Sequence, residues 1–405
     1  MNRITNKKTG ILYISYDGIL EPLGQSQVLS YLERLAARHN IILISFEKSS
    51  DWKHTGKRDA VCRRIQAAGI EWVPLRYHKR FSVLATLFDI TQGIMVGGWL
   101  TARYRIQIIH ARSYVSSVIA LVLKKMFGVK YIFDMRGFWA DERVDGGIWP
   151  SNSRIYYIAK WFEQHFLLSA DYVVSLTHSA LSEIKTFPYL QGRMPRFEVI
   201  TTCADLELFK ATTNIIEKRE RSFVLGYVGS VGTWYLFDEV LRFFKILHKQ
   251  VPGAVLHILN RGDHDYILER ISVAGLSPDL FQLNAADHTE VVQVMQKMDA
   301  GIFFYKPTYS KLATAPTKLG EFLGCGVPCI SNAGVGDIQE ILQGEQVGVA
   351  LNNFSDKELD AGLKSLFELT RQPDIQQRCR QAAGNYFSLE NGVAAYDRIY
   401  NELAS

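Results

Sequence analysis

The stretch from Ser310 to Glu340 reads SKLATAPTKLGEFLGCGVPCISNAGVGDIQE and contains a complete helix-to-strand step. Pro316 suits the opening turn of a helix, where its missing N–H would have no partner, so a helix should begin near residue 315. Lys318 and Glu321 then lie three residues apart on one helix face. The GCGVP that follows ends the helix, and CISN predicts a short buried strand. The stretch therefore predicts part of an α/β sheet.

Apolar runs of strand length recur on both sides of this stretch and alternate with helical patterns. They cover residues 10–16, 40–47, 70–75, 106–111, 130–135, 170–177, 223–230, 254–260, 281–285 and 300–306. Such alternation predicts parallel sheets covered by helices, whose ligands bind beyond the carboxyl ends of the strands. A chain of 405 residues is too long for one ordinary core, so two domains are expected.

PTKLGEFLGCGVPCISN resembles the donor-binding segment of retaining family-4 glycosyltransferases. The resemblance implies the GT-B fold, in which two Rossmann-like domains with parallel sheets face each other across a cleft. It assigns 1–200 to an N-terminal, acceptor-side domain and 201–385 to a nucleotide-sugar donor domain, joined by a hinge-like segment at 197–209. In this fold the final helix, here 386–405, crosses back to the first domain.

The same resemblance implies roles on the donor side. Glu321 matches the residue that accepts hydrogen bonds from the ribose hydroxyls, a role that suits a carboxylate with its several lone pairs. The family's earlier glutamate, which contacts the sugar, is Ala313 here, and this departure leaves the sugar undefined. The GSVGTWY segment also lacks the family's basic residues for the diphosphate. Arg261, Lys311 and Lys318 are the candidate replacements, or else solvent-facing charges.

Glycines mark two further segments of the expected donor site. YDGILEPLGQSQ at 16–27 resembles the family's N-terminal donor loop, in which Gly24 would let the diphosphate approach a helix end. Gly334 and Gly336, in AGVGD at 333–337, precede a predicted helix and could offer free N–H groups to an anion or a sugar hydroxyl. Both segments would also suit ordinary turns.

Polar residues follow two strands of the first half. IIHARS resembles the family's H-x-H strand end, with Arg112 in place of the second histidine. His110 is expected to be a buried, hydrogen-bonded residue, and Arg112 either a cation for phosphate or acceptor or a surface ion-pair partner. The loop 133–150 mixes Arg136 and Asp141 with tryptophans, a composition that can stack a sugar ring and bind its hydroxyls.

The reaction implied by the resemblance is metal-independent transfer from a nucleotide sugar with retention of configuration. The departing diphosphate can itself help to remove the acceptor proton, and neither a metal clamp of the D-x-D type nor a cofactor is expected. Three alternatives stay open. An inverting transferase would need Asp17, Asp141 or Glu142 as its base, a sugar-nucleotide epimerase would need no acceptor, and a sensing module would bind without transfer.

Charge and composition bear on location and partners. Residues 1–200 carry 27 Lys and Arg against 16 Asp and Glu, and the remainder is net negative. No nucleic-acid-binding motif accompanies the positive charge. Five cysteines without a C-x-x-C pair suggest a reducing, cytoplasmic compartment, and the longest candidate for a membrane segment, 93–100, is too short. Basic and aromatic stretches at 52–64 and 76–105 predict peripheral docking on the inner membrane face and a glycan or polyprenyl-linked acceptor.

Overall fold

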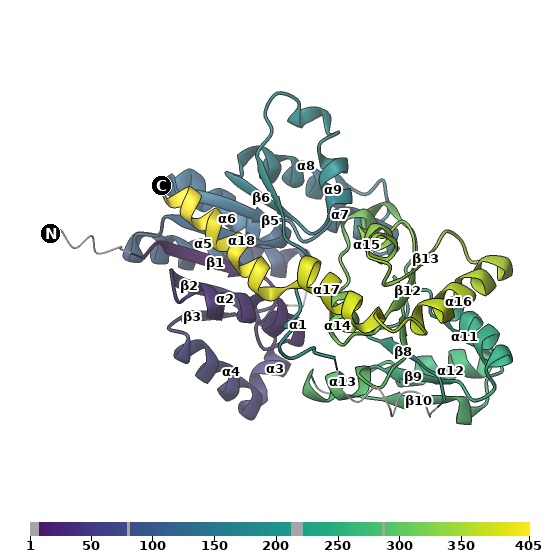
Figure 1. The fold of residues 1–405 in the computed structure, drawn as a ribbon. Coiled ribbons are helices and arrows are strands. Elements are labelled where there is room, and N and C mark those ends of the chain that lie inside the picture. Colours follow the sequence, from purple (N-terminus) through teal and green to yellow (C-terminus); the bar gives the residue numbers. More distant parts are fainter. Residues whose placement is uncertain (1–7, 79–81, 212–221, 286–287) are drawn as a thin grey trace. The chain divides into compact units, whose positions relative to one another are not determined.

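The computed structural model describes residues 8–78, 82–211, 222–285 and 288–405 (Figure 1). Contacts within the chain divide it into two compact units. The first unit comprises residues 1–200 together with 390–405, and the second comprises residues 201–389.

A parallel sheet forms the centre of the first unit, in the order β3-β2-β1-β4-β5-β6-β7 within the described residues. Its strands are β1 (Gly10–Ser15), β2 (Asn40–Glu47), β3 (Glu71–Arg76), β4 (Ile108–Arg112), β5 (Lys130–Asp134), β6 (Tyr172–Ser175) and β7 (Arg196–Val199). The helices are α1 (Pro22–Gly24), η1 (Gln25–Leu29, a π-helix), α2 (Ser30–Leu35), α3 (Ser49–Lys53), α4 (Thr55–Ala67), α5 (Ser82–Tyr104), α6 (Ser113–Phe127), α7 (Trp139–Asp145), α8 (Arg154–Ser169), α9 (His178–Ile184), η2 (Pro188–Leu190) and α18 (Leu389–Ala404).

The second unit contains a smaller parallel sheet, in the order β10-β9-β8-β11-β12-β13 within the described residues. Its strands are β8 (Val224–Val228), β9 (Val255–Leu259), β10 (Phe281–Asn284), β11 (Ala300–Ile302), β12 (Cys329–Asn332) and β13 (Gly348–Leu351). Its helices are α11 (Phe237–Gln250), α12 (His264–Val273), η3 (Pro278–Leu280), α13 (His288–Met295), η4 (Tyr309–Ala313), α14 (Thr317–Gly324), α15 (Ile338–Gly344), α16 (Asp356–Thr370) and α17 (Ile375–Phe387).

Both sheets reverse their strand order once. The reversal lies between β1 and β4 in the first unit and between β8 and β11 in the second. Loops that follow two such strands diverge to opposite faces of the sheet and leave a crevice at their carboxyl ends, where ligands of open α/β sheets bind. These two points are therefore the first places to look for functional side chains.

The sequence predicted the α/β fold with two parallel sheets, and the structure confirms it. Two strands were not predicted, β7 at the edge of the first sheet and β13 at the edge of the second. The start of α14 was also wrong by two residues. Pro316 has extended backbone angles (φ −70°, ψ 121°) and precedes the helix, which begins at Thr317.

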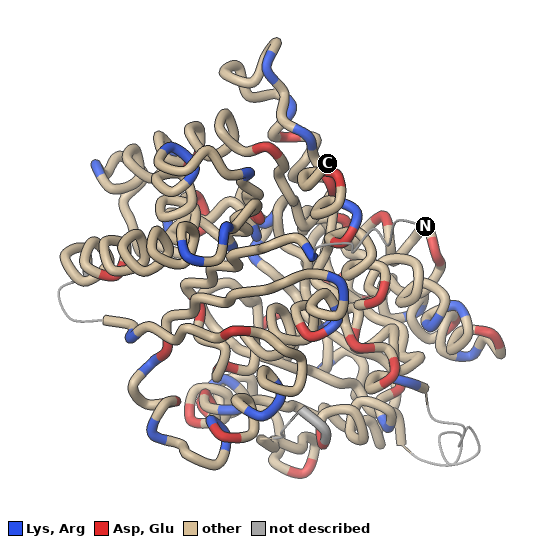
Figure 2. The backbone as a smooth tube through the Cα atoms, turned by 90° about the vertical axis from the view of Figure 1, so that its left-hand side faces the viewer, with Lys and Arg blue, Asp and Glu red and all other residues tan. Residues whose placement is uncertain are grey.

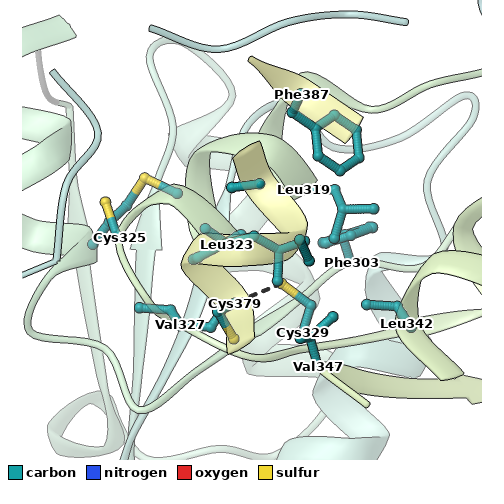
Figure 3. Packing of buried hydrophobic residues seen from close by; sticks show 14 of the residues in the cluster. Phe303, Leu319, Leu323, Cys325, Val327, Cys329, Leu342, Val347, Cys379 and Phe387 are labelled. Atoms are coloured by element: carbon teal, nitrogen blue, oxygen red, sulfur yellow. Dashed lines mark hydrogen bonds between the residues drawn. The ribbon is translucent and has the colours of Figure 1, made fainter. Parts of the chain in front are cut away.

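The inner face of α14 is held in the core of the second unit. Leu319, Phe322 and Leu323 are almost completely buried, among Phe303, Cys329, Leu342 and Phe387 (Figure 3). Two glycines of this helix, Gly320 and Gly324, also pack closely against protein. A Cβ on Gly320 would lie 2.8 Å from the Cβ of Phe387, and one on Gly324 would lie 2.8 Å from the Phe209 carbonyl oxygen. Large side chains thus fix the position of the helix and of the polar residues that it carries.

Helix α5 is longer and more apolar than the sequence suggested. The segment Val83–Tyr104 is long and apolar enough to cross a membrane by length and composition, although 33% of its most apolar window is buried in the protein. Its one acidic residue, Asp89, is buried and accepts hydrogen bonds from the Tyr16 hydroxyl (2.9 Å) and the His78 backbone N–H (3.2 Å). The short run 93–100 therefore belongs to a continuous apolar helix.

Candidate active site

The ammonium group of Lys318 lies in an aromatic cage at the strand-order reversal of the second unit. Its Nζ lies 4.4 Å from the ring centroid of Tyr235, 5.4 Å from that of Tyr227 and 5.8 Å from that of Phe303. These rings come from β8 and from the segments after β8 and β11, whereas the lysine comes from the first turn of α14. Aromatic faces attract a cation in this geometry.

No described residue gives the Lys318 ammonium a hydrogen-bond partner, although the residue is buried. Burial lowers the pKa of Lys318, and the neighbouring Tyr235 and Glu321 oppose this effect. A buried cation without a hydrogen-bond partner is costly and is uncommon as a purely structural feature. Three ammonium donors thus remain available at the reversal of the sheet.

Gly229 makes room for this ammonium group. The residue follows β8 with φ +117°, a backbone conformation that favours glycine, and a Cβ there would lie 2.8 Å from Lys318 Nζ. The sequence shows only that the GSVGTWY segment lacks basic residues. The structure supplies the cation from α14, and the glycine lets it reach this loop.

The other two predicted cations come from different segments of the second unit. Lys311 is buried, and its Nζ lies 4.5 Å from the ring centroid of Trp234. Arg261 follows β9 and is exposed. The adjacent Asn260 donates its side-chain N–H to the carbonyl oxygen of Gly229 (3.0 Å) and so ties the β8 and β9 loops together. The structure therefore groups Lys311 and Lys318 around residues 229–235, with Arg261 on the neighbouring loop.

Glu321 lies one helical turn after Lys318 and is partly exposed. Burial raises the pKa of its carboxyl group to about 7, while the charge of Lys318 acts in the opposite direction. The carboxyl group thus changes its charge near neutral pH. An ionised carboxylate at this position has lone pairs for two hydroxyl donors, whereas the protonated form has fewer.

The AGVGD loop differs from the prediction in one respect. The expected free N–H groups at 333–337 are partly used within the protein. Gly336 donates its N–H to the Lys311 carbonyl oxygen (2.8 Å), and Ala333 donates to that of Leu351 (2.9 Å). Gly334 and Gly336 both have positive φ and shape the turn before α15. Gly336 thus holds the backbone of Lys311 instead of offering its amide to a ligand.

A buried ionic cluster occupies the ends of β4 and β5 in the first unit. Its centre is Asp134, whose carboxylate lies 3.9 Å from a guanidinium nitrogen of Arg112 and 3.9 Å from one of Arg136. His110 Nε2 lies 3.6 Å from the same carboxylate, and the Tyr396 hydroxyl of α18 donates to it (3.1 Å). The structure thus brings two predicted cations, Arg112 and Arg136, onto one carboxylate.

The electrostatics of this cluster favour an ionised Asp134 and a neutral His110. Burial alone would raise the pKa of Asp134, but Arg136, His110 and Arg112 together hold it below its usual value. Burial lowers the pKa of His110, which hydrogen-bonds through Nδ1 to the Tyr400 hydroxyl (2.7 Å), as expected for a structural histidine. Arg112 Nε has no hydrogen-bond partner within the described residues and lies 3.7 Å from Asp17, at the β1 loop.

Asp134 and Gly229 were not identified from the sequence. Asp134 ends the apolar strand KYIFD. An acidic residue at the end of a buried parallel strand could have been named as a candidate site residue, because ligands bind at such strand ends. Gly229 begins the GSVG segment directly after β8, so a glycine there also had a positional signal. Neither signal shows which distant cation lies against the residue.

Two other predicted site residues, Asp141 and Gly24, make close contacts within the first unit. Asp141 accepts hydrogen bonds from the Tyr156 hydroxyl (2.8 Å) and the Lys160 ammonium (2.9 Å), and is buried. Gly24 is also buried, and a Cβ there would lie 2.1 Å from the Gly18 carbonyl oxygen. A glycine is therefore required at this position by the packing of its own loop, whether or not a diphosphate binds there.

Among the described residues, no three His, Cys, Asp or Glu side chains come together where they could hold a metal ion. The clusters found at the two reversals contain cations, aromatic rings and hydrogen-bonding groups. Such groups can bind an anionic substrate and stabilise negative charge that develops on a leaving group.

Comparison with known proteins identifies the family and supports the fold. The family described as "Glycosyl transferases group 1" matches residues 209–385, and the family described as "Glycosyl transferase 4-like domain" matches residues 24–200. A comparison with curated protein sequences gave no match.

Solved structures with low sequence identity share the whole architecture. Sucrose-phosphate synthase from Thermosynechococcus elongatus has 14% identity and a TM-score of 0.73, over 98% of this chain and 100% of that chain. A glycosyltransferase from Rickettsia africae has 15% identity and a TM-score of 0.70, over 98% and 99%. HepE from Anabaena, solved with UDP and glucose, has 14% identity and a TM-score of 0.68, over 98% and 100%.

At these identities the structural likeness establishes the fold, and the two family matches, which together span most of the chain, establish the class of enzyme. The chain is a glycosyltransferase with the GT-B fold, in which residues 24–200 belong to the glycosyl transferase 4-like domains and residues 209–385 to the glycosyl transferases group 1.

Proposed function

We propose that this enzyme transfers a sugar from a nucleotide-sugar donor to a glycan or lipid-linked acceptor, with retention of configuration and without a metal ion. The observation that carries the proposal is the Lys318 ammonium, buried and without a hydrogen-bond partner at the reversal of the second sheet. A fixed cation there suits the negative charge that grows on a departing diphosphate. Glu321, one turn later, suits the ribose hydroxyls.

The donor can be identified by a thermal-shift panel of UDP, GDP, dTDP and CMP sugars, because a ligand that binds only the folded state raises its stability. UDP sugars come first, since the similar HepE was solved with UDP-glucose. Analysis of the product anomer separates retention from inversion. For the inverting alternative, Asp17 is half exposed and Glu142 is partly exposed, whereas Asp141 is held by Tyr156 and Lys160.

Glu321→Gln should weaken binding of the identified donor by about 10- to 150-fold, the effect of losing roughly 1.5–3 kcal/mol in hydrogen bonds to a charged group.

The wild-type affinity should also depend on pH. As the pH falls from 8 to 6, the carboxyl group with a pKa of about 7 takes up a proton and loses acceptor lone pairs. Donor affinity should therefore fall by roughly tenfold over this range. Calorimetric titration at several pH values measures both effects.

The glutamine variant supplies the control for the pH effect, because an amide does not titrate between pH 6 and 8. Its affinity should be weak and flat across the range. Equal affinity of wild type and variant at pH 8, with both proteins folded, would remove the ribose role from Glu321. Glu340→Gln serves as a matched control, because Glu340 is exposed on α15 and is not part of the aromatic cage.

We also propose that the first unit docks on the anionic inner face of the plasma membrane, a location that brings it to a lipid-linked acceptor. Between Val83 and Ala102, Asp89 is the only charged residue, so α5 is almost uniformly tan in Figure 2. The exposed apolar side chains of α5 include Leu84, Phe88, Met95 and Trp99. We call these four the α5 outer face. Exposed Arg103 and Arg105 follow it.

An apolar helix face with basic residues at its end is typical of proteins that lie on anionic lipid. The predicted stretch at 52–64 contributes less free charge than its composition suggested. Arg64 forms two hydrogen bonds to the Glu33 carboxylate (both 2.9 Å), and Arg58 pairs with Asp59. Of the basic residues before α5, Lys79 and Arg80 lie outside the described residues.

Reversal of Arg103 and Arg105 to Glu should reduce binding to anionic vesicles by roughly tenfold or more, because each basic residue near such a surface contributes about 1 kcal/mol. Binding of the wild type should fall as salt is raised. Co-sedimentation with vesicles of phosphatidylglycerol and phosphatidylcholine measures both effects. Lys364→Glu on α16 and Arg371→Glu directly after it, both at exposed positions of the second unit, provide a charge-matched control.

Equal partitioning of the wild type onto neutral and anionic vesicles would contradict docking by charge. Unchanged binding of the Arg103 and Arg105 reversal would do so as well. Either result would leave the positive charge of the first unit as a solubilising surface and favour a water-soluble acceptor.

A further inference from the structure

A groove of about 570 Å³ opens in the first unit beside the reversal of its sheet. One wall comes from the start of α5, through Val83 and Leu87, and the opposite wall comes from the start of α8, through Ile155 and Ile158. The ring of Tyr114, from α6, lies in its lining between them. Leu87 and Ile158 are 53% and 56% exposed, so large apolar side chains face water on both sides of the groove. Exposed apolar surface of this extent marks a binding surface.

The groove is polar towards the carboxyl ends of the strands. Asp17, after β1, lines it and pairs with Arg112 (3.7 Å), which belongs to the buried cluster around Asp134. Lys48 lines it and pairs with Glu21. Arg143 lines it as well, with its guanidinium 5.3 Å from the ring centroid of Trp139 and no ion pair to any described residue. Among the described residues that line the groove, Arg143 is thus a cation left for a ligand.

We propose that this groove binds the hydrocarbon chain of the lipid-linked acceptor, with the phosphate next to that chain held by Arg143. The inference rests on the proposed function, because it assumes that the enzyme uses a lipid acceptor, and it assigns the residues that would recognise it. Val83, Leu87, Ile155 and Ile158 contact the chain, and Arg143 supplies the charge complementary to the phosphate. The volume lies within the range of small-ligand sites.

The arrangement favours a lipid phosphate over a peptide or a free sugar. An extended peptide needs a row of hydrogen-bonding groups along its backbone, whereas the two walls at the starts of α5 and α8 present aliphatic side chains. A free sugar has no apolar chain to cover the exposed side chains of Leu87 and Ile158. The α5 outer face belongs to the same helix as Leu87, so a chain that leaves a bilayer under this helix reaches the groove without crossing water.

Titration calorimetry with farnesyl diphosphate, below its aggregation concentration, tests the proposal on the intact protein. Isopentenyl diphosphate carries the same diphosphate on five carbons and is the reference ligand. The longer ligand should bind at one site and at least roughly tenfold more tightly, because each buried methylene strengthens binding about fourfold. Leu87→Gln with Ile158→Gln should abolish this difference, and Arg143→Gln should weaken farnesyl diphosphate but leave farnesol unchanged.

Leu84→Gln is the matched control, because Leu84 is 69% exposed on the same helix but does not line the groove. It should retain the preference for the longer chain. Equal affinity for the two diphosphates, or equal losses in the Leu84 and Leu87 variants, would overturn the proposal. Binding of the identified nucleotide sugar is measured in the same samples. If donor binding persists while the chain-length preference is missing, only the groove assignment fails, whereas missing donor binding would refute the proposed function itself.

Discussion

Lys318→Met should lower turnover by about 10²- to 10³-fold, the loss expected when one fixed group that stabilises transition-state charge is removed. The apparent donor constant should rise much less, since the charge on the diphosphate grows towards the transition state. Methionine keeps an unbranched side chain among Tyr227, Tyr235 and Phe303, so the change removes the charge with little loss of packing. Release of the nucleoside diphosphate at saturating donor measures turnover.

Stability distinguishes this role from a structural one. The ammonium group is buried without a hydrogen-bond partner, so its removal should leave the thermal midpoint unchanged or raise it. Lys306→Met changes an exposed lysine that follows β11 in the same unit and should leave turnover close to that of the wild type. A Lys318→Met enzyme with normal turnover, or one that is inactive because it is unfolded, would remove the catalytic assignment.

The sequence was most informative where local chemistry determines structure. In the stretch Ser310–Glu340, the helix, its termination by the GCGVP segment and the CISN strand all follow from residue preferences along the chain, and the structure confirms them. The start of the helix was misplaced because a proline can occupy either the first turn or the position before it, and both choices leave its missing N–H harmless.

Residue partners were much harder to predict. Lys318 was a candidate by its place on α14, but its cage is assembled from β8 and from the segments after β8 and β11, at positions more than 10 residues away along the chain. The cluster around Asp134 is similar, because Tyr396 and Tyr400 come from the last helix. Such sites are set by tertiary packing, and no spacing in the sequence encodes them.

Helix α5 shows how burial changes the meaning of a single residue. Asp89 interrupts the apolar pattern in the sequence, and the apolar run predicted there covered only residues 93–100. In the structure its carboxylate faces inward, onto Tyr16 and His78, and the outer surface keeps its apolar character. The apolar groove beside α5 could not be inferred, since its two walls are about 70 residues apart in the chain.

Asp134→Ala should destabilise the first unit by about 3–5 kcal/mol, the cost of breaking a buried ion pair by removing one partner. Without this carboxylate, Arg112 would keep only the half-exposed Asp17 as a counter-charge, and the largely buried Arg136 would lose its ion-pair partner among the described residues. The hydroxyl of Tyr396 would lose its acceptor as well. Tyr396→Phe removes only that hydrogen bond and should cost about 1 kcal/mol. The ratio of the two effects tests whether charge, rather than hydrogen bonding, holds the cluster together.

Urea unfolding followed by tryptophan fluorescence is suited to this measurement, because six of the seven tryptophans lie in residues 1–200 and report on the first unit.

The contribution of Asp134 to the free energy of unfolding should depend on pH with a defined sign. The folded-state pKa of Asp134 lies below its unfolded value, so its contribution is present above an unfolded pKa of about 4 and is lost as the pH falls through the folded value. The difference between wild type and Asp134→Asn should therefore stay constant from pH 5 to 8 on the same principle and shrink below pH 4. A difference that grew on acidification would show that Asp134 is not ionised in the native protein, and the two arginines would then need another counter-charge.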